Sequence, residues 1–259
     1  MRVIGVLDLI AGRAVHGRGG RRESYVPVAS AAGAAFAAGD ALALARTYVD
    51  RLGVRELYVA DLDTIAGGEA AGSQDALVAA LAAVGAPLWL DAGVSSTDRA
   101  RHALALGAAN VIVGLETLRS YEALKTICGA IGSGRVAFSL DLREGEPVVA
   151  TREGGAVPPG EPAHVVAARA AAAGAGSVIV LDLARVGTGR GLDFDLIARV
   201  RDAVPGLMLL AGGGVRGPED LTRLADTGCD GALVATALHD GRLDAAAVAV
   251  AEGHRTLSR

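Results

Sequence analysis

Aromatic side chains are scarce in this sequence, and Phe, Trp and Tyr together make up 3% of its residues. Single-stranded nucleic acids are bound largely by stacking of bases on aromatic rings, so this composition argues against such a role. Long basic runs are also missing, because 25 basic and 29 acidic residues give a formal net charge of -4. The densest basic cluster, Arg18–Arg22, suits a small anion or an ordinary solvated loop better than a duplex. We expect no nucleic-acid partner.

Cysteine is nearly absent as well. The two cysteines, Cys128 and Cys229, stand in neither a CxxC motif nor a metal-ligand cluster, and we expect buried, reduced thiols. The N-terminus enters a strand directly, without the charged and apolar regions of a signal peptide. No uninterrupted apolar run is long enough to span a bilayer. The sequence therefore indicates a cytoplasmic protein with no membrane partner.

Hydrophobic residues, 51% of the chain, gather in short β-branched runs that alternate with alanine-rich helical segments. We predict strands at Arg2–Leu7, Glu56–Ala60, Pro87–Leu90, Asn110–Val113, Arg135–Leu140, Ser177–Leu181, Leu207–Ala211 and Gly231–Ala235. We predict helices at Asp40–Leu52, Ser73–Val84, Ser96–Leu106, Leu118–Ala130, Pro162–Ala173, Phe194–Ala203, Pro218–Asp226 and Asp244–Glu252. Strands that are apolar throughout are typical of a parallel sheet covered on both faces. Eight strand–helix units predict an α/β fold, a single (β/α)8 TIM barrel over residues 1–259.

The two halves of the chain resemble each other. Leu7-Asp8-Leu9 returns 133 residues later as Leu140-Asp141-Leu142, and three further pairs of segments share an offset of 121 residues. The predicted barrel therefore consists of two half-barrels, about residues 1–131 and 132–259. A doubly wound open sheet is the competing fold, but it would need a GxGxxG motif after its first strand, and none is there.

Carboxylates stand at the ends of five predicted strands, where barrel active sites form. They are Asp8, Asp61, Asp91, Asp141 and Asp182. Oxygen ligands could hold a hard cation, but a mouth crowded with carboxylates equally suits acid/base chemistry. Each aspartate could also simply cap a turn. Because Asp8 and Asp141 occupy duplicated positions, we favour a shared acid/base site, with no metal.

A glycine turn after the seventh strand and Thr236 after the eighth predict a phosphate site. Gly213 and Gly214 would offer bare backbone N–H groups beside the start of a short helix. The first half has Asp91 and Glu116 instead, and two acids would repel phosphate. That end could prefer a cation, an amine or a hydroxyl-rich group. Alternatively, the two acids pair with Arg99, Arg119 or the Arg18–Arg22 cluster. Long loops over Gly17–Gly39 and Arg152–Glu161 are expected at the mouth.

The paired aspartates, the duplicated halves and the Gly212-Gly213-Gly214 turn resemble the HisA/HisF family of histidine-biosynthesis barrels over nearly the whole chain. The resemblance implies an aldose-to-ketose isomerase of the Amadori type, with Asp8 as base, Asp141 as acid and no cofactor. It also implies a phosphosugar substrate. From the resemblance and the strand ends, we expect the substrate to be bound by Asp61, Asp91, Glu116, Asp182, Arg185 and Thr188. We expect its phosphate to be bound by Gly189, Gly213, Gly214 and Thr236.

The chain departs from the family pattern in three places. Val186 stands where the family has an aspartate after strand six, and Asp91-Ala92-Gly93-Val94-Ser95 replaces a Gly-Gly-Gly-Ile-Arg turn that binds a second phosphate. The loop after strand one, from His16 to Tyr25, also differs from the usual pattern. These departures indicate a divergent HisA-like branch.

Several functions remain open from the sequence. The isomerase could act in histidine biosynthesis or on a singly phosphorylated riboside, such as an arylamine C-riboside phosphate of methanopterin-type cofactor synthesis. A HisF-like synthase fed by a glutaminase partner would need an intact second phosphate site. A non-catalytic barrel that binds a phosphorylated metabolite would have no need of paired acids. Either a monomer or a homodimer is compatible with the sequence.

Overall fold

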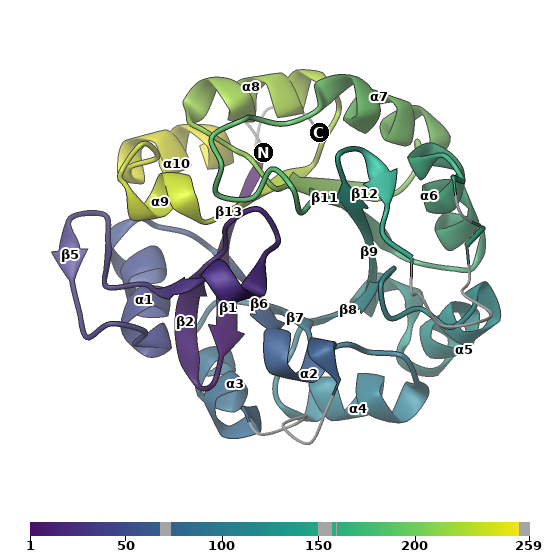
Figure 1. Ribbon diagram of the computed structural model, residues 1–259, viewed down its shortest axis with the longest axis horizontal. Coiled ribbons are helices and arrows are strands. Elements are labelled where there is room, and N and C mark those ends of the chain that lie inside the picture. Colours follow the sequence, from purple (N-terminus) through teal and green to yellow (C-terminus); the bar gives the residue numbers. More distant parts are fainter. Residues whose placement is uncertain (68–73, 150–156, 159, 254–259) are drawn as a thin grey trace.

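The computed structural model describes residues 1–67, 74–149, 157–158 and 160–253. Eight parallel strands form a closed barrel, and strand β1 pairs with β6 on one side and with β13 on the other (Figure 1). The eight are β1 (Arg2–Ile10), β6 (Glu56–Asp61), β7 (Leu88–Asp91), β8 (Asn110–Gly114), β9 (Val136–Arg143), β11 (Ser177–Asp182), β12 (Met208–Gly212) and β13 (Gly231–Val234). Each coincides with a predicted strand, and the predicted (β/α)8 barrel is confirmed.

Helices surround the barrel (Figure 1). They are α1 (Ala41–Arg46), α3 (Asp75–Ala82), α4 (Thr97–Ala105), α5 (Tyr121–Ile131), α6 (Ala163–Ala172), α7 (Phe194–Ala203), α8 (Pro218–Asp226) and α10 (Ala245–Gly253). Asp40, Ser96, Ser120 and Asp193 begin four of them by accepting the backbone N–H three residues ahead. Over the described ranges, no helix has the length and apolar character needed to cross a membrane.

Some local structure differs from the prediction. The helix expected over Asp40–Leu52 changes at Thr47, where α1 gives way to a π-helical segment, Thr47–Arg51. The Thr47 hydroxyl donates to the Ala43 carbonyl oxygen at 2.8 Å, in the turn where the change occurs. Two short helices, α2 (Leu62–Ala66) and α9 (Thr236–His239), were not predicted.

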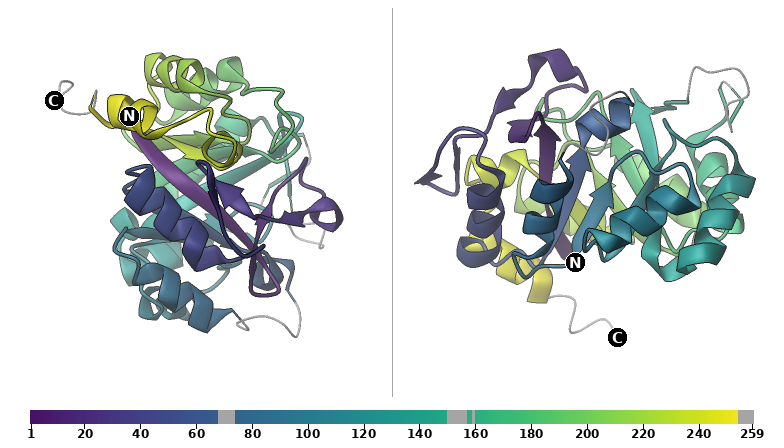
Figure 2. Two further views of the ribbon diagram at one scale, coloured as in Figure 1. Left: turned by 90° about the vertical axis from the view of Figure 1, so that its left-hand side faces the viewer. Right: turned by 90° about the horizontal axis from the view of Figure 1, so that it is seen from below.

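The end of the barrel where the strands finish carries additional hairpins. Strands β1 and β9 extend past the barrel to pair with β2 (Arg13–His16) and β10 (Glu146–Pro147). The predicted loop over Gly17–Gly39 contains β3 (Val26–Pro27), β4 (Ser30–Ala31) and β5 (Ala34–Ala35). Figure 2 shows these hairpins and α2 at the end away from the N-terminus. The predicted Arg152–Glu161 loop lies mostly outside the described residues.

Two apolar layers explain why the strands show no polar alternation. Side chains on the outer face of the strands pack against the helices and include Leu7, Leu57 and Leu90. Side chains on the inner face fill the barrel, among them Ile4, Ile112, Ile179, Leu210 and Leu233. Both faces are buried, so burial selects apolar residues at nearly every strand position.

A polar cluster closes the barrel at the end where the strands begin. Trp89 Nε1 donates to Glu56 Oε2 at 2.9 Å, and Arg2 Nη1 lies 3.1 Å from each Glu56 oxygen. Glu56 is only 9% exposed, and these donors compensate the cost of burying its charge. This cluster fills the barrel at the end opposite the one where the strands finish.

Candidate active site

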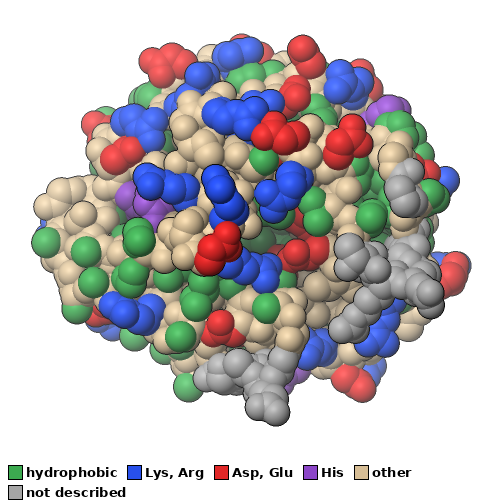
Figure 3. Space-filling model, viewed as in Figure 1, with side chains coloured by type: hydrophobic (Ala, Val, Ile, Leu, Met, Phe, Trp, Pro, Cys, Tyr) green, Lys and Arg blue, Asp and Glu red, His purple; other side chains and the backbone are tan. Residues whose placement is uncertain are grey.

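A cavity of about 250 Å³ opens where the barrel strands end. Figure 3 shows it as a hollow near the centre of this face, with acidic side chains at its edge and Lys or Arg side chains around it. The cationic side chains that line it are Arg22, Arg143, Arg216 and Arg242. Barrel enzymes bind their substrates at this end, so we take the cavity as the candidate site.

The duplicated motifs form matching hairpins beside the cavity. Ala11 and Gly12 have φ of 48° and 74°, and Glu144 and Gly145 have φ of 53° and 82°. Two consecutive residues with positive φ form the tight turn that matches the twist of paired strands. Each turn extends one barrel strand beyond the sheet, and Asp8 or Asp141 lies in that strand just before the turn.

Asp8 faces the cavity without a hydrogen-bond partner among the described residues. Burial raises the pKa of its carboxyl from 3.8 to about 6, and the positive charge of Arg22 lowers it by a smaller amount. A Cβ at Gly17 would lie 2.9 Å from Asp8 Oδ2 and 3.1 Å from Val186 Cγ1. The backbone at Gly17 therefore lies against this carboxyl, and Val186 packs on the same glycine. A carboxyl with a pKa near 6 can act as a base at neutral pH.

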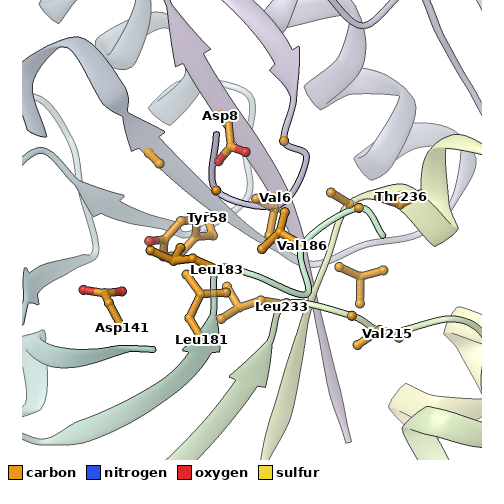
Figure 4. A pocket seen from close by; sticks show the side chains of 18 of the residues that line it. Val6, Asp8, Tyr58, Asp141, Leu181, Leu183, Val186, Val215, Leu233 and Thr236 are labelled. Atoms are coloured by element: carbon orange, nitrogen blue, oxygen red, sulfur yellow. The ribbon is translucent and has the colours of Figure 1, made fainter. Parts of the chain in front are cut away.

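Asp141 lies on another side of the cavity, with Tyr58 between it and Asp8 (Figure 4). Its Oδ1 accepts a hydrogen bond from the Ser139 hydroxyl at 2.7 Å. Burial, followed by the negative charges of Asp91 and Glu116, raises the pKa of Asp141 well above its usual value. Asp141 is thus placed to hold a proton that it can donate.

Asp91 and Glu116, both predicted to bind substrate, also line the cavity. Tyr58 donates its hydroxyl to Asp91 Oδ2 at 3.1 Å, and burial raises the pKa of Asp91 to about 7. Glu116 pairs with Arg22 at 3.3 Å, which is one of the pairings left open by the sequence. Arg99 instead donates to the Ala92 carbonyl oxygen at 3.4 Å.

The structure does not bring Asp61 and Asp182 to the cavity, although both were predicted to bind substrate. In the parallel ladders Asp8 is level with Ala60, and Asp141 with Leu181. Neighbours at the same level point to the same face, so the next residue on each strand, Asp61 or Asp182, points outward.

Both outward carboxylates fix the neighbouring loops. Asp61 begins α2 and accepts hydrogen bonds from Thr64 N at 3.0 Å, Thr64 Oγ1 at 2.7 Å and Gln74 Nε2 at 2.6 Å. Gln74 in turn accepts from Gly12 N at 2.9 Å. Asp182 binds the second hairpin directly, through Glu144 N at 3.2 Å and Gly145 N at 3.1 Å. These carboxylates therefore position the hairpins that carry Asp8 and Asp141.

Arg185 and Thr188, also predicted to bind substrate, are not among the residues that line the cavity. The guanidinium of Arg185 lies 3.3 Å from Asp182 Oδ2 and donates to the Gly191 carbonyl oxygen at 3.1 Å. Thr188 is exposed and donates to the Arg185 carbonyl oxygen at 2.8 Å. Both side chains hold the turn that places Val186 and Gly189 at the cavity.

The predicted phosphate-binding residues Gly189, Gly213, Gly214 and Thr236 all line the cavity. A Cβ at Gly213 would lie 2.6 Å from the Asp182 carbonyl oxygen, and one at Gly214 would lie 2.8 Å from that of Gly191. Both glycines also have positive φ, of 82° and 147°. Larger residues are excluded, which leaves the backbone open to a ligand.

Sequence reasoning missed several lining residues. His16 does not line the cavity itself, but its Nε2 lies 2.9 Å from Oγ1 of the lining residue Thr236 and connects β2 to the predicted phosphate site. Arg143 and Arg216 line the cavity and follow the predicted site residues Asp141 and Gly214 by two positions each. The motifs around those two residues could therefore have indicated the arginines. Tyr58 and Arg242 also line the cavity, but no motif in the sequence indicated them. Tyr58 lies inside the buried strand β6, and Arg242 lies in a surface turn. No metal-binding group of three or more His, Cys, Asp or Glu side chains occurs within the described ranges.

Comparison with known proteins places the chain in a family. The model described as "Histidine biosynthesis protein" matches residues 2–244. A relative from Thermus thermophilus, named 1-(5-phosphoribosyl)-5-((5-phosphoribosylamino)methylideneamino) imidazole-4-carboxamide isomerase, is 33% identical over 245 residues, 94% of this chain and 96% of its own. A protein of the same name from Natronomonas pharaonis is 35% identical over 253 residues, 95% and 97% of the two chains.

The HisF side of the family is similar as well. The imidazole glycerol phosphate synthase subunit HisF of Symbiobacterium thermophilum is 34% identical over 209 residues, 79% of this chain and 81% of its own. The family match over most of the chain, the closed barrel and the shared cavity of Asp8 and Asp141 lead to one conclusion: the chain belongs to the histidine-biosynthesis family of barrels.

Proposed function

We propose that this protein is an isomerase that converts an aldose into a ketose on a phosphoribosyl compound. The observation that carries the proposal is that Asp8 and Asp141 line one cavity whose other wall is formed by Gly189, Gly213 and Gly214. Isomerases of the imidazole carboxamide type, named for two phosphoribosyl groups, are similar to this chain over more than nine-tenths of its length. The cavity supplies a base, an acid and an anion cradle, which this reaction requires.

The reaction begins with opening of the ribose ring. Asp141 donates a proton to the ring oxygen as the bond between C1 and that oxygen breaks. In an N-riboside the amine nitrogen supplies the electron pair that forms a C1–N double bond, and in an arylamine C-riboside the amine supplies it through the ring to form a double bond between C1 and the ring carbon. Asp8 then removes the proton from C2, which gives an enolamine. Asp8 then returns a proton to C1 while the C2 hydroxyl gives up its proton to Asp141 as the C2=O bond forms. This yields the ketose and restores both carboxyls, so the protons balance without an oxidant or a reductant.

The surroundings of the two aspartates suit these roles. Asp8 has to lose its proton near neutral pH, and its pKa of about 6 allows this. Asp141 has to keep a proton, and burial together with its acidic neighbours raises its pKa. Val186, which stands where the family has another aspartate, gives the cavity an apolar wall next to Gly17. The phosphate would bind at Gly213, Gly214 and Thr236, opposite the reacting carbons.

The proposal can be tested by direct assay. The purified protein is incubated with the bisphosphorylated aminoaldose for which the relatives are named and with singly phosphorylated ribosides, and the ketose is detected by NMR. Turnover of any of these compounds, lost in Asp8→Asn and in Asp141→Asn, would support the proposal. A folded protein that binds the compounds without converting them would instead favour the non-catalytic barrel.

Growth of a histidine auxotroph that lacks its own isomerase separates the two substrate classes. Growth that depends on Asp8 would identify the bisphosphorylated compound as substrate. No growth, combined with turnover of a singly phosphorylated riboside in the assay, would assign the protein to that class, which includes the arylamine C-riboside phosphates.

A further inference from the structure

The part of the cavity next to β7 and β8 has an unusual lining for a protein that binds phosphoribosyl compounds. Asp91 and Asp141 are 7% and 5% exposed, and both carboxyls face the end of β8. A Cβ at Gly114 would lie 3.2 Å from Asp141 Oδ2 and 4.0 Å from Asp91 Oδ2. Glu116 lines the cavity directly after this strand. Three carboxyls therefore meet at what we call the β7–β8 end of the cavity.

Few positive charges compensate these carboxyls. Arg22 lies 3.3 Å from Glu116, and this is the one ion pair that any of the three carboxyls makes among the described residues. Arg99, the nearest arginine along the chain after Asp91, turns to the Ala92 carbonyl oxygen and does not line the cavity. A phosphate dianion at this end would face the carboxylate of Asp91, which has no ion pair among the described residues, and at this depth water screens the repulsion weakly.

The wall beside Asp91 is apolar. Leu62 and Ile65 of α2 line the cavity together with Tyr58. The turn after β7 packs directly on this helix, because a Cβ at Gly93 would lie 3.1 Å from Ile65 Cα. The short helix is thus fixed against the turn that carries Asp91. A flat apolar group fits beside such a wall better than a hydrated one.

Asp91 keeps acceptor capacity for a ligand. Its Oδ2 accepts the Tyr58 hydroxyl at 3.1 Å, and its Oδ1 accepts Gly93 N at 3.3 Å. The two oxygens of a carboxylate offer about four acceptor sites in total, so about two remain. An amine, amide or hydroxyl group of a ligand could use these sites from the cavity.

We propose that Asp91 determines substrate specificity: the β7–β8 end takes an aglycone with an apolar ring and a hydrogen-bond donor, and it rejects a second phosphate. This inference rests on the proposed function, because it places the ribose phosphate at Gly213, Gly214 and Thr236. It assigns the substrate to the singly phosphorylated class and gives a physical reason for the loss of the second phosphate site.

The test uses calorimetric binding of three matched ligands, each made as the 2-deoxy sugar, because without the C2 hydroxyl none of them can become a ketose. The parent is a phenyl C-riboside 5-phosphate, the second carries an amino group on the ring carbon opposite the sugar, and the third carries a phosphonomethyl group there. We expect the amino compound to bind about tenfold more tightly than the parent, as one buried hydrogen bond to a charged group predicts. The phosphonomethyl compound should bind at least about tenfold more weakly.

Variants then identify the residue responsible. Asp91→Asn should reduce the preference for the amino compound and strengthen binding of the phosphonomethyl compound by about tenfold or more. Asp202→Asn is the matched control, because Asp202 is exposed on the outer helix α7. The control should leave all three affinities within about twofold of those of the wild type, as expected for a distant surface charge.

The outcomes separate this inference from the proposed function. If the parent compound binds but the phosphonomethyl compound binds as tightly, or if Asp91→Asn leaves the order unchanged, the inference about Asp91 is overturned while the isomerase proposal stands. If none of the three compounds binds to the folded protein, the phosphoribosyl site itself is refuted, and the inference fails with it.

Discussion

Replacing Asp8 by asparagine should make the protein more stable while it removes activity. The carboxyl is buried without a hydrogen-bond partner among the described residues, and its pKa rises from 3.8 to about 6. At about 1.4 kcal/mol per pKa unit, this change corresponds to about 3 kcal/mol of destabilisation when Asp8 is ionised. Asp8 remains partly open to water in the cavity, which reduces the cost, so we expect Asp8→Asn to gain about 1 to 2 kcal/mol at pH 7.5.

The stability difference between Asp8→Asn and the wild type should depend on pH in a definite direction. Because the folded-state pKa lies above the unfolded-state value, the wild type gains stability relative to the variant as pH falls through about 6. The advantage of Asp8→Asn should therefore fall to less than half of its size between pH 7.5 and pH 4.5. Other titrating groups are common to both proteins and cancel in the difference.

The assay is urea unfolding followed by circular dichroism at several pH values. Asp202→Asn, an exposed change of the same charge on α7, serves as control and should alter the free energy of unfolding by less than about 0.5 kcal/mol. The reasoning is refuted if Asp8→Asn is less stable than the wild type at pH 7.5, or if the difference between them does not change with pH.

Three further predictions follow from the site. The kcat/KM of isomerisation should rise as pH is raised through about 6, because Asp8 has to be ionised to accept a proton; a rate that is flat across this range would contradict its role as base. Thr236→Val should weaken binding of ribose 5-phosphate by about tenfold in calorimetry, because Thr236 lines the predicted phosphate site. The kcat should change far less, because the phosphate is bound equally in the ground state and in the transition state. Asp220→Ala should lower the free energy of unfolding in urea by about 2 kcal/mol, because three hydrogen bonds from Arg216 to the buried carboxylate are lost; an unchanged midpoint would show that they contribute nothing.

The sequence by itself determined the barrel and its duplication. Runs such as Val3–Val6 and Val178–Leu181 are apolar at every position because both faces of each strand are buried, and this pattern requires no knowledge of distant contacts. The glycines at 213 and 214 were also identifiable, because a run of glycines directly after a predicted strand is typical of a turn that leaves its backbone bare. The structure adds that both have positive φ and close backbone neighbours. Asp8 and Asp141 were identified because the motif around them occurs twice.

Only the tertiary structure decided which carboxylates face the cavity. Asp8, Asp61, Asp141 and Asp182 all end a strand in the sequence, but successive side chains of a strand point to opposite faces. A shift of one residue in the register between neighbouring strands reverses that direction, and the pairing of Asp8 with Ala60 and of Asp141 with Leu181 fixes it here.

Long-range contacts decided the charge of the site in the same way. Glu116 pairs with Arg22 across 94 positions of sequence, whereas Asp91 meets the hydroxyl of Tyr58 rather than an arginine. Local patterns carry no information about such partners, because they depend on how closed strands and loops bring distant segments together. The pKa values of the carboxyls, and with them the division into base and acid, arise from burial and neighbours that exist only in the folded barrel.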